Sequence, residues 1–156
     1  MVRRYCNPLS VYARQWTEAF DDCVQDAFIE LATADRPDNP VSWLFRVVRN
    51  KALNSSRSQR RRDRHESNAA LYRTDSFKGP FDQLQQHEEQ AHLIHSLDRL
   101  SNDDRELVVL RIWSGLTWKE IGELTSQPPS TAHRRYSVAL EQLKKLMTKQ
   151  MAENDE

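Results

Sequence analysis

Glycine, cysteine and long apolar runs are scarce in this sequence of 156 residues, and each scarcity excludes a class of protein. With only three glycines and few alternating β-branched runs, no sheet is expected and the chain is predicted to be all-α. No apolar run is long enough for a membrane span or a secretory signal, so a cytoplasmic location is expected. Cys6 and Cys23 lack the spacing of a metal-binding pair and are expected to be free thiols.

Motifs that carry catalysis are also missing. The sequence has no Gly-rich phosphate loop, no nucleophile elbow and no HExxH motif, so no enzymatic activity and no cofactor are expected. His87, His92 and His95 have no cysteine or carboxylate spacing around them of the kind that a structural zinc site requires. They are interpreted as solvated side chains, and no metal is expected.

Net charge is absent overall but concentrated locally. The 23 basic and 23 acidic residues cancel, yet residues 43–64 hold eight lysines and arginines against Asp63 alone, a local charge of +7. Residues 67–100 hold three basic against five acidic residues. Because phosphate neutralisation needs local charge, the basic segment is either a polyanion-binding surface or a solvated, partly disordered arginine run.

The length and apolar content fit one domain or two small ones. Residues 1–34 show helical apolar spacing, and two prolines place a loop at residues 34–40. A long helix is then expected from Ser42, which is a candidate N-cap. The Ser-, Arg- and Asn-rich stretch from about Ser55 to Phe81 is predicted to be a flexible linker, after which helical spacing resumes through Leu100.

The C-terminal third has the pattern of a helix-turn-helix. A helix over residues 104–113 is expected to end at Ser114-Gly115, and Thr117 with Glu120 forms a capping box for the next helix. After a short break at residues 126–129 a third helix follows, with a buried stripe of Ala132, Tyr136, Ala139, Leu140 and Leu143. That stripe leaves Ser130, Arg134 and Ser137 outermost, with Thr131, His133 and Arg135 at the flanks.

Such a third helix suits the major groove, where hydroxyls, histidine and arginine reach base edges and arginines also bind phosphates. Helix-turn-helix pairs also occur as simple packing units. The pattern alone therefore leaves both interpretations open.

Two sequence blocks together resemble a known family. The segments DDCVQDAFIEL (21–31) and SWLFRVVRNKALNSSRSQRRR (42–62) resemble the second conserved region of sigma-70 factors of the extracytoplasmic-function type. Residues 97–146 resemble the fourth region of the same family. The resemblance implies two small helical domains joined by a flexible linker, with boundaries at 1–64, 65–96 (linker), 97–147 and 148–156 (tail). It also implies core RNA polymerase and promoter DNA as partners, and leaves open whether an anti-sigma factor binds.

The resemblance also implies roles for individual residues. The segment that docks on the polymerase corresponds to Asp22, Val24, Gln25, Asp26, Phe28 and Ile29. Contacts to the −10 element correspond to Arg46, Arg49, Asn50, Asn54 and Arg57, with Trp43 more plausible as a core residue than as a base-stacking one. By position alone, the loop 36–40 matches the family's base-capturing loop. The −35 reader corresponds to Ser130, Thr131, His133, Arg134 and Arg135.

Some positions depart from the family pattern. His133 stands where lysine or arginine is common, and Val138, Leu140 and Glu141 replace residues that are frequently basic or polar, so a weaker phosphate grip is expected. The first helix is also expected to be shorter than in the family. Two alternatives remain, a stand-alone helix-turn-helix regulator and a polymerase-binding protein that no longer initiates; a simple repressor would have no use for Gln25 and Asp26.

Overall fold

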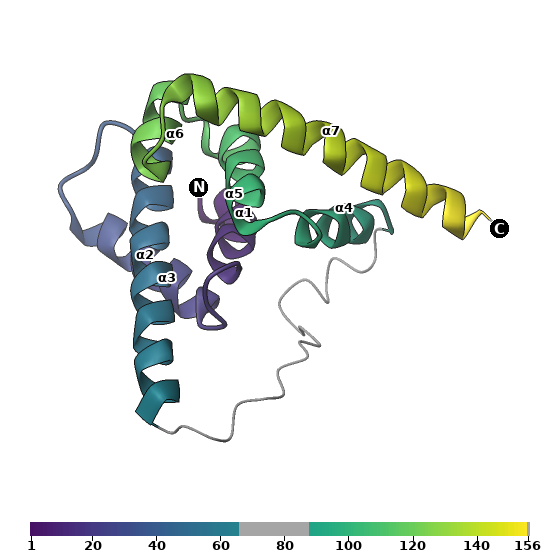
Figure 1. The fold of residues 1–156 in the computed structure, drawn as a ribbon. Coiled ribbons are helices and arrows are strands. Elements are labelled where there is room, and N and C mark those ends of the chain that lie inside the picture. Colours follow the sequence, from purple (N-terminus) through teal and green to yellow (C-terminus); the bar gives the residue numbers. More distant parts are fainter. Residues whose placement is uncertain (66–87, 156) are drawn as a thin grey trace.

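The computed structural model describes residues 1–65 and 88–155, and every regular element in these two ranges is a helix (Figure 1). In chain order they are α1 (Val2–Arg14), α2 (Phe20–Thr33), α3 (Pro40–His65), α4 (Glu88–Asp98), α5 (Asn102–Val109), the π-helical turn η2 (Leu110–Ser114), α6 (Trp118–Thr125) and α7 (Pro129–Asn154). The all-α prediction is confirmed. None of the described helices is apolar over a length that could cross a membrane.

The N-terminal part is a three-helix unit of α1, α2 and α3. Its helices form because apolar residues recur every three or four positions, so that each helix has one apolar face. Those faces meet in a core to which the helices contribute Leu9, Tyr12 and Ala13, then Cys23, Val24 and Ala27, then Leu44, Phe45, Val48 and Ala52. Trp43 packs partly buried against this core, as the sequence interpretation favoured.

The start of α3 differs from the prediction. The helix begins at Pro40, and Ser42 is buried inside its first turn rather than capping it. The Asn39 side chain caps the helix instead, because its Oδ1 accepts from the Ser42 backbone N–H at 3.1 Å. Proline suits the first helical position, since it lacks an N–H that would in any case be unpaired, and asparagine is a strong N-cap residue.

The linker prediction is wrong for residues 55–65, which continue α3 as far as His65. Arginine and glutamine are good helix formers, and Gln59 donates to Asp63 one turn later at 3.0 Å. Ser55 also hydrogen-bonds Thr17, at 2.9 Å between the hydroxyl oxygens, which ties this stretch to the end of α1. Residues 66–87, with His87 among them, lie outside the described residues.

The C-terminal part confirms the predicted helix-turn-helix. Gly115 has the left-handed φ of +69° that ends η2, and Thr117 and Glu120 form both bonds of the capping box at the start of α6. Pro129 opens α7 in its first turn, and Ala132, Ala139 and Leu143 are buried as the apolar spacing predicted. Ile112, in the π-helical turn η2 that follows α5, is half exposed.

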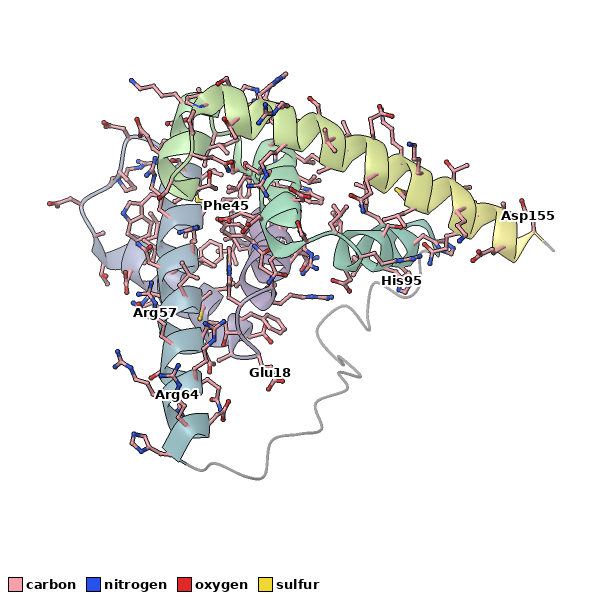
Figure 2. The ribbon with its side chains drawn as sticks, viewed as in Figure 1. Glu18, Phe45, Arg57, Arg64, His95 and Asp155 are labelled. Atoms are coloured by element: carbon pink, nitrogen blue, oxygen red, sulfur yellow. The ribbon has the colours of Figure 1, made fainter. Side chains whose placement is uncertain are left out.

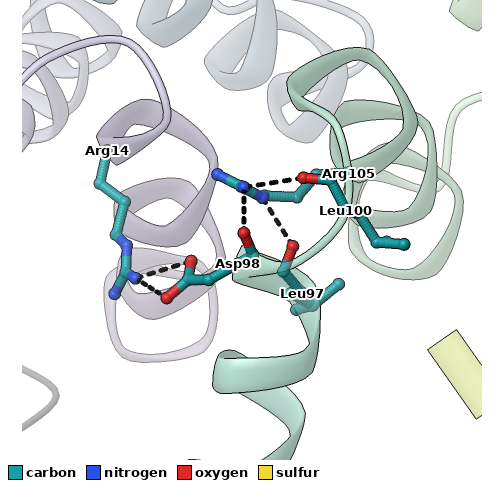
Figure 3. A network of polar contacts seen from close by, with 5 residues as sticks. All are labelled: Arg14, Leu97, Asp98, Leu100 and Arg105. Carbon is teal, nitrogen blue, oxygen red and sulfur yellow. Dashed lines mark hydrogen bonds and ion pairs between the residues drawn. The ribbon is translucent and has the colours of Figure 1, made fainter. Parts of the chain in front are cut away.

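Helix α4 lies along α7, and it falls where helical spacing was expected to resume at the end of the segment 65–96. Leu97 and Leu100 share a small core with Val108, Ala139 and Leu143. Arg105 holds the C-terminal end of α4, because its guanidinium donates to the carbonyls of Leu97, Asp98 and Leu100 at 2.8, 3.0 and 3.1 Å (Figure 3). Burial lowers the pKa of Arg105, and the three carbonyl bonds satisfy the guanidinium there.

The two helical parts pack directly against each other. Helix α1 contacts α5, and α3 contacts η2, so α5 stands beside α1 in the centre of the molecule (Figure 1). One apolar core runs through both parts, since Leu107, Val109 and Leu110 join the cluster that contains Leu9 and Phe45. The C-terminal part also has a small core of its own around Leu97 and Leu143, so the two helical parts have one shared core and a second, separate one.

Candidate functional site

The predicted docking segment on α2 divides into an exposed face and a buried one. Asp22, Gln25, Asp26 and Ile29 follow the spacing of three, one and three residues that places side chains on one side of a helix, and all four are exposed. Ile29 is 62% exposed, so a large apolar side chain lies uncovered among polar and charged ones. Val24 and Phe28 face the other way, Val24 into the core and Phe28 against it.

One edge of the exposed face of α2 is fixed to α3. Glu30 Oε1 and Lys51 Nζ form an ion pair at 2.6 Å, and the hydrogen bond to Glu30 raises the pKa of Lys51. Burial and the neighbouring Asp26 charge raise the pKa of the Cys23 thiol, which is free in the structure, as is Cys6. The ion pair therefore holds α2 against α3 and leaves Asp22, Gln25, Asp26 and Ile29 exposed.

A polar stripe runs along α3. Arg46, Asn50, Asn54 and Arg57 are spaced by four, four and three residues and share one face; the last three are exposed and Arg46 is half-buried. The stripe leads into the exposed Arg60, Arg61, Arg62 and Arg64. Figure 2 shows Arg57 and Arg64 on the lower length of α3, away from α6 and α7. The local positive charge therefore lies on an ordered helix.

Arg49 is separate from the rest of the predicted −10 set. Its Nε donates to Glu106 Oε1 at 2.7 Å, and Tyr12 Oη donates to the same oxygen at 2.6 Å. The Trp16 ring lies under the guanidinium, 5.7 Å from its carbon to the ring centroid. The structure therefore turns Arg49 toward α5, whereas Asn50 beside it in the chain is exposed.

Burial alone would lower the pKa of Arg49, but the hydrogen bond and the charge of Glu106 raise it above the usual value. Burial and the same carboxylate raise the pKa of Tyr12 well above the usual tyrosine value. Tyr12 therefore stays a neutral hydrogen-bond donor and Arg49 a cation at every physiological pH.

The residues of the predicted −35 reader also fall into an exposed group and a half-buried one. Ser130, His133 and Arg134 are exposed on one face of α7, and the His133 ring meets the edge of Trp118 at 5.0 Å between centroids. Thr131 and Arg135 are half-buried, and Arg135 Nη2 donates to Asp104 Oδ1 at 3.2 Å. Arg134 is thus the arginine that α7 presents outward, and Arg135 is held back against α5.

The turn before α7 depends on the small size of Gly122. A Cβ placed there would lie 2.6 Å from the Gln127 carbonyl oxygen and 3.2 Å from the Pro129 nitrogen, both backbone atoms. Gln127 N–H donates to the Gly122 carbonyl at 3.0 Å, which holds the turn closed. The angle between α6 and α7 therefore requires glycine at this position.

We expect Gly122→Ala to destabilise the helix-turn-helix by roughly 1–2 kcal/mol, because the methyl group must push the turn apart. Chemical denaturation followed by circular dichroism measures the loss. Glu123→Ala, on the exposed side of the same helix, is the control and should change stability by less than about 0.5 kcal/mol. Equal stability of the glycine variant and the wild type would show that the turn relaxes freely.

Sequence reasoning missed Tyr12, Trp16, Arg14, Asp98 and Glu106, which join the two helical parts. The one usable signal was Glu106, a carboxylate beside the apolar run Leu107–Leu110 that a helix must bury. In the described residues no cluster of three histidines, cysteines or carboxylates could hold a metal ion.

Comparisons with known proteins match both helical parts. A family model described as Sigma-70 region 2 matches residues 1–62, and one described as Sigma-70, region 4 matches residues 92–143. The probable RNA polymerase sigma factor RfaY of Xanthomonas campestris is 28% identical over 128 residues, covering 78% of this chain. Only 32% of that relative is covered, so the chain spans about a third of its length.

The fold matches a solved structure as well. The sigma factor RpoE from Bartonella quintana, in complex with the anti-sigma factor NepR, superposes with a TM-score of 0.61 at 20% identity. The match covers 94% of each chain. It shows that the helices are arranged in the same order and architecture.

Proposed function

The chain belongs to the sigma-70 family, since models of two regions of that family match it, and from this premise we propose that it is a factor of the extracytoplasmic-function type that binds core RNA polymerase and directs it to promoters. The chain itself would perform no chemistry; it would position the polymerase and stabilise opened DNA. The observation that carries the proposal is the exposed face of α2, where Ile29 stands uncovered among Asp22, Gln25 and Asp26. A stand-alone regulator would need α7 and not this face.

The polymerase contact is proposed for that α2 face. Protein interfaces commonly have an apolar centre with a polar rim, and Ile29 surrounded by two carboxylates and an amide fits that pattern. The resemblance to the family supports a contact with the clamp helices of the largest polymerase subunit. Val24 and Phe28, which were assigned to the same contact, support the helix from inside.

The −10 contact is proposed for the polar stripe of α3. Arginines can neutralise phosphates, and the amides of Asn50 and Asn54 can hydrogen-bond base edges. The loop before α3 exposes Arg36 and Asp38, beside which an extruded base could be held at an unstacking cost of roughly a few kcal/mol. An ordered basic helix is better suited to this than a disordered arginine run, because its contacts are positioned in advance.

The −35 contact is proposed for the exposed face of α7. Ser130, His133 and Arg134 lie in its first two turns, where a recognition helix meets base edges. Thr131 lies beside them, and Arg135, bonded to Asp104, would orient the helix or reach a phosphate from the flank. The RpoE chain was solved with an anti-sigma factor, which supports proposing a regulator of that class here too.

Run-off transcription with purified core RNA polymerase tests the function. The chain should produce transcripts from a subset of promoters that core enzyme alone does not use. Failure of the chain to co-purify with core enzyme would refute the polymerase part, and co-purification without transcripts would favour a factor that no longer initiates.

Asp26→Arg should weaken retention of the chain on immobilised core polymerase. The change reverses a charge beside Ile29 on the α2 face, and a mismatched charge at an interface typically costs several kcal/mol. Glu153→Arg, a charge reversal at the exposed end of α7, is the matched control and should be retained like wild type. Equal retention of both variants would move the contact away from α2.

A further inference from the structure

One buried carboxylate joins the two helical parts. Glu106 in α5 is only 5% exposed, and its Oε1 accepts from Tyr12 of α1 and from Arg49 of α3. Tyr12 and Arg49 belong to the part that matches region 2, and Glu106 belongs to the part that matches region 4. A single carboxylate oxygen of the C-terminal part therefore accepts from two side chains of the N-terminal part.

The N-terminal part offers a shaped seat for this carboxylate. The Trp16 ring stands edge-on to Tyr12 at 4.9 Å between centroids and lies beside the Arg49 guanidinium at 5.7 Å. Phe45 lies on the other side of Tyr12, with 5.3 Å between centroids. The aromatic rings exclude water, so the charge of Glu106 is balanced by Arg49 and by the hydroxyl of Tyr12.

A second contact lies at the rim. Arg14 Nη2 donates to both carboxylate oxygens of Asp98, at 2.9 and 2.7 Å, and so joins α1 to the end of α4 (Figure 3). Asp98 is partly exposed, so this ion pair contributes little stability. The Asp98 side chain lies outside the proposed polymerase and DNA surfaces. A substitution there therefore weakens the closed arrangement without removing a proposed binding residue.

The polar contact at Glu106 can open without leaving a buried charge unpaired. A buried charge is costly unless it is paired, and here the Glu106 charge, Arg49 and Tyr12 satisfy one another. Separation of the two parts would return all three to water, where none is left unpaired. The equilibrium between closed and open chain therefore depends on the pairing at this one site and on the apolar contacts around Leu107 and Leu110.

We propose that the bond of Glu106 to Tyr12 and Arg49 is an autoinhibitory latch, which keeps the free chain closed and holds Arg49 against α5 and away from DNA. The proposal rests on the proposed function for the identity of the nucleic acid that is kept off. The alternative is that the contact is a permanent structural interface, which also persists when nucleic acid binds. The two differ in what happens when the latch is weakened.

The test compares the free, full-length wild-type chain with Glu106→Gln. Glutamine has nearly the same shape and still accepts from Tyr12, but it leaves the Arg49 cation without a counter-charge in the closed form. The probe is a fluorescein-labelled duplex with a short unpaired segment, read by fluorescence anisotropy, and the radius of gyration is measured by small-angle X-ray scattering. Because the apparent dissociation constant falls as the binding-competent fraction rises, we expect expansion and roughly five- to tenfold tighter binding.

Two controls separate the latch from simple electrostatics. Glu153→Gln removes one acidic charge from the exposed end of α7, and it should neither expand the chain nor tighten binding. Arg49→Ala should expand the chain without the gain in affinity, since it opens the latch and removes the freed cation. A gain in Glu153→Gln equal to that in Glu106→Gln would overturn the proposal, because net charge would then explain both.

Other outcomes would also decide between a latch and a structural interface. Expansion of Glu106→Gln without tighter binding, or normal dimensions with unchanged binding, would show a structural interface and overturn the latch. If Glu106→Gln loses helicity, Tyr12→Phe and Asp98→Asn carry the same comparison, with smaller gains expected in the same order. All of these measurements use the free chain, so a wild type that is inactive with core polymerase would refute the proposed function and leave the latch result standing.

Discussion

A promoter preference that appears only on binding to core RNA polymerase is the largest effect expected of this chain. Residues 101–147 hold seven basic against six acidic residues, so the part with the helix-turn-helix has little electrostatic grip on duplex DNA. The charge of +7 at residues 43–64 lies on α3, in the other part. In the free chain Arg49 and Arg135 are also paired with Glu106 and Asp104.

Binding to polymerase would change this by holding both parts on one duplex. Each weak contact then acts at an effective concentration that can reach the millimolar range, and avidity can exceed either single affinity by about 10²–10⁴. Fluorescence anisotropy with promoter and scrambled duplexes at physiological salt should show little preference for the free chain and a clear one for the complex. Tight, sequence-selective binding by the free chain would instead support the stand-alone regulator.

The second large effect is expected from Arg134→Ala. Arg134 is exposed on the face of α7 that carries Ser130 and His133, and its guanidinium can make a bidentate contact to a guanine. Loss of such a contact should cost about 1–3 kcal/mol and relax preference at one −35 position, whereas loss of a phosphate contact would weaken all promoters alike. Run-off transcription from a set of single-substitution promoters distinguishes the two.

Further variants of α7 test whether the effect is specific to Arg134. Lys145→Ala removes a positive charge from an exposed position three turns later on the same helix, and it should leave the promoter ranking unchanged. Arg135→Ala should act mainly through its lost bond to Asp104, so a change in stability is expected with it. Normal promoter output from the Arg134→Ala, Arg135→Ala double variant would remove α7 from the reading role.

Local patterns in the sequence predicted several helix boundaries correctly. The capping box of Thr117 and Glu120 and the end of the preceding helix at Gly115 were predicted, because each depends on residues within one helical turn. The third helix was expected after the break at residues 126–129, and α7 begins at the last residue of that break, Pro129. The start of α3 was expected at Ser42, but Asn39, which precedes Pro40, caps the helix instead. The linker was begun too early because composition does not distinguish a polar helix from a polar coil.

The sequence by itself determined the helices, the helix-turn-helix and the face of α2 that stays exposed, since helical periodicity fixes which side chains share a side. Only the tertiary structure decided that the two parts share a core, and that Arg49 and Arg135 are bound while Asn50 and Arg134 are exposed. The physical reason is sequence separation: the bonds of Glu106 to Tyr12 and Arg49 span 94 and 57 residues, and no local pattern encodes them.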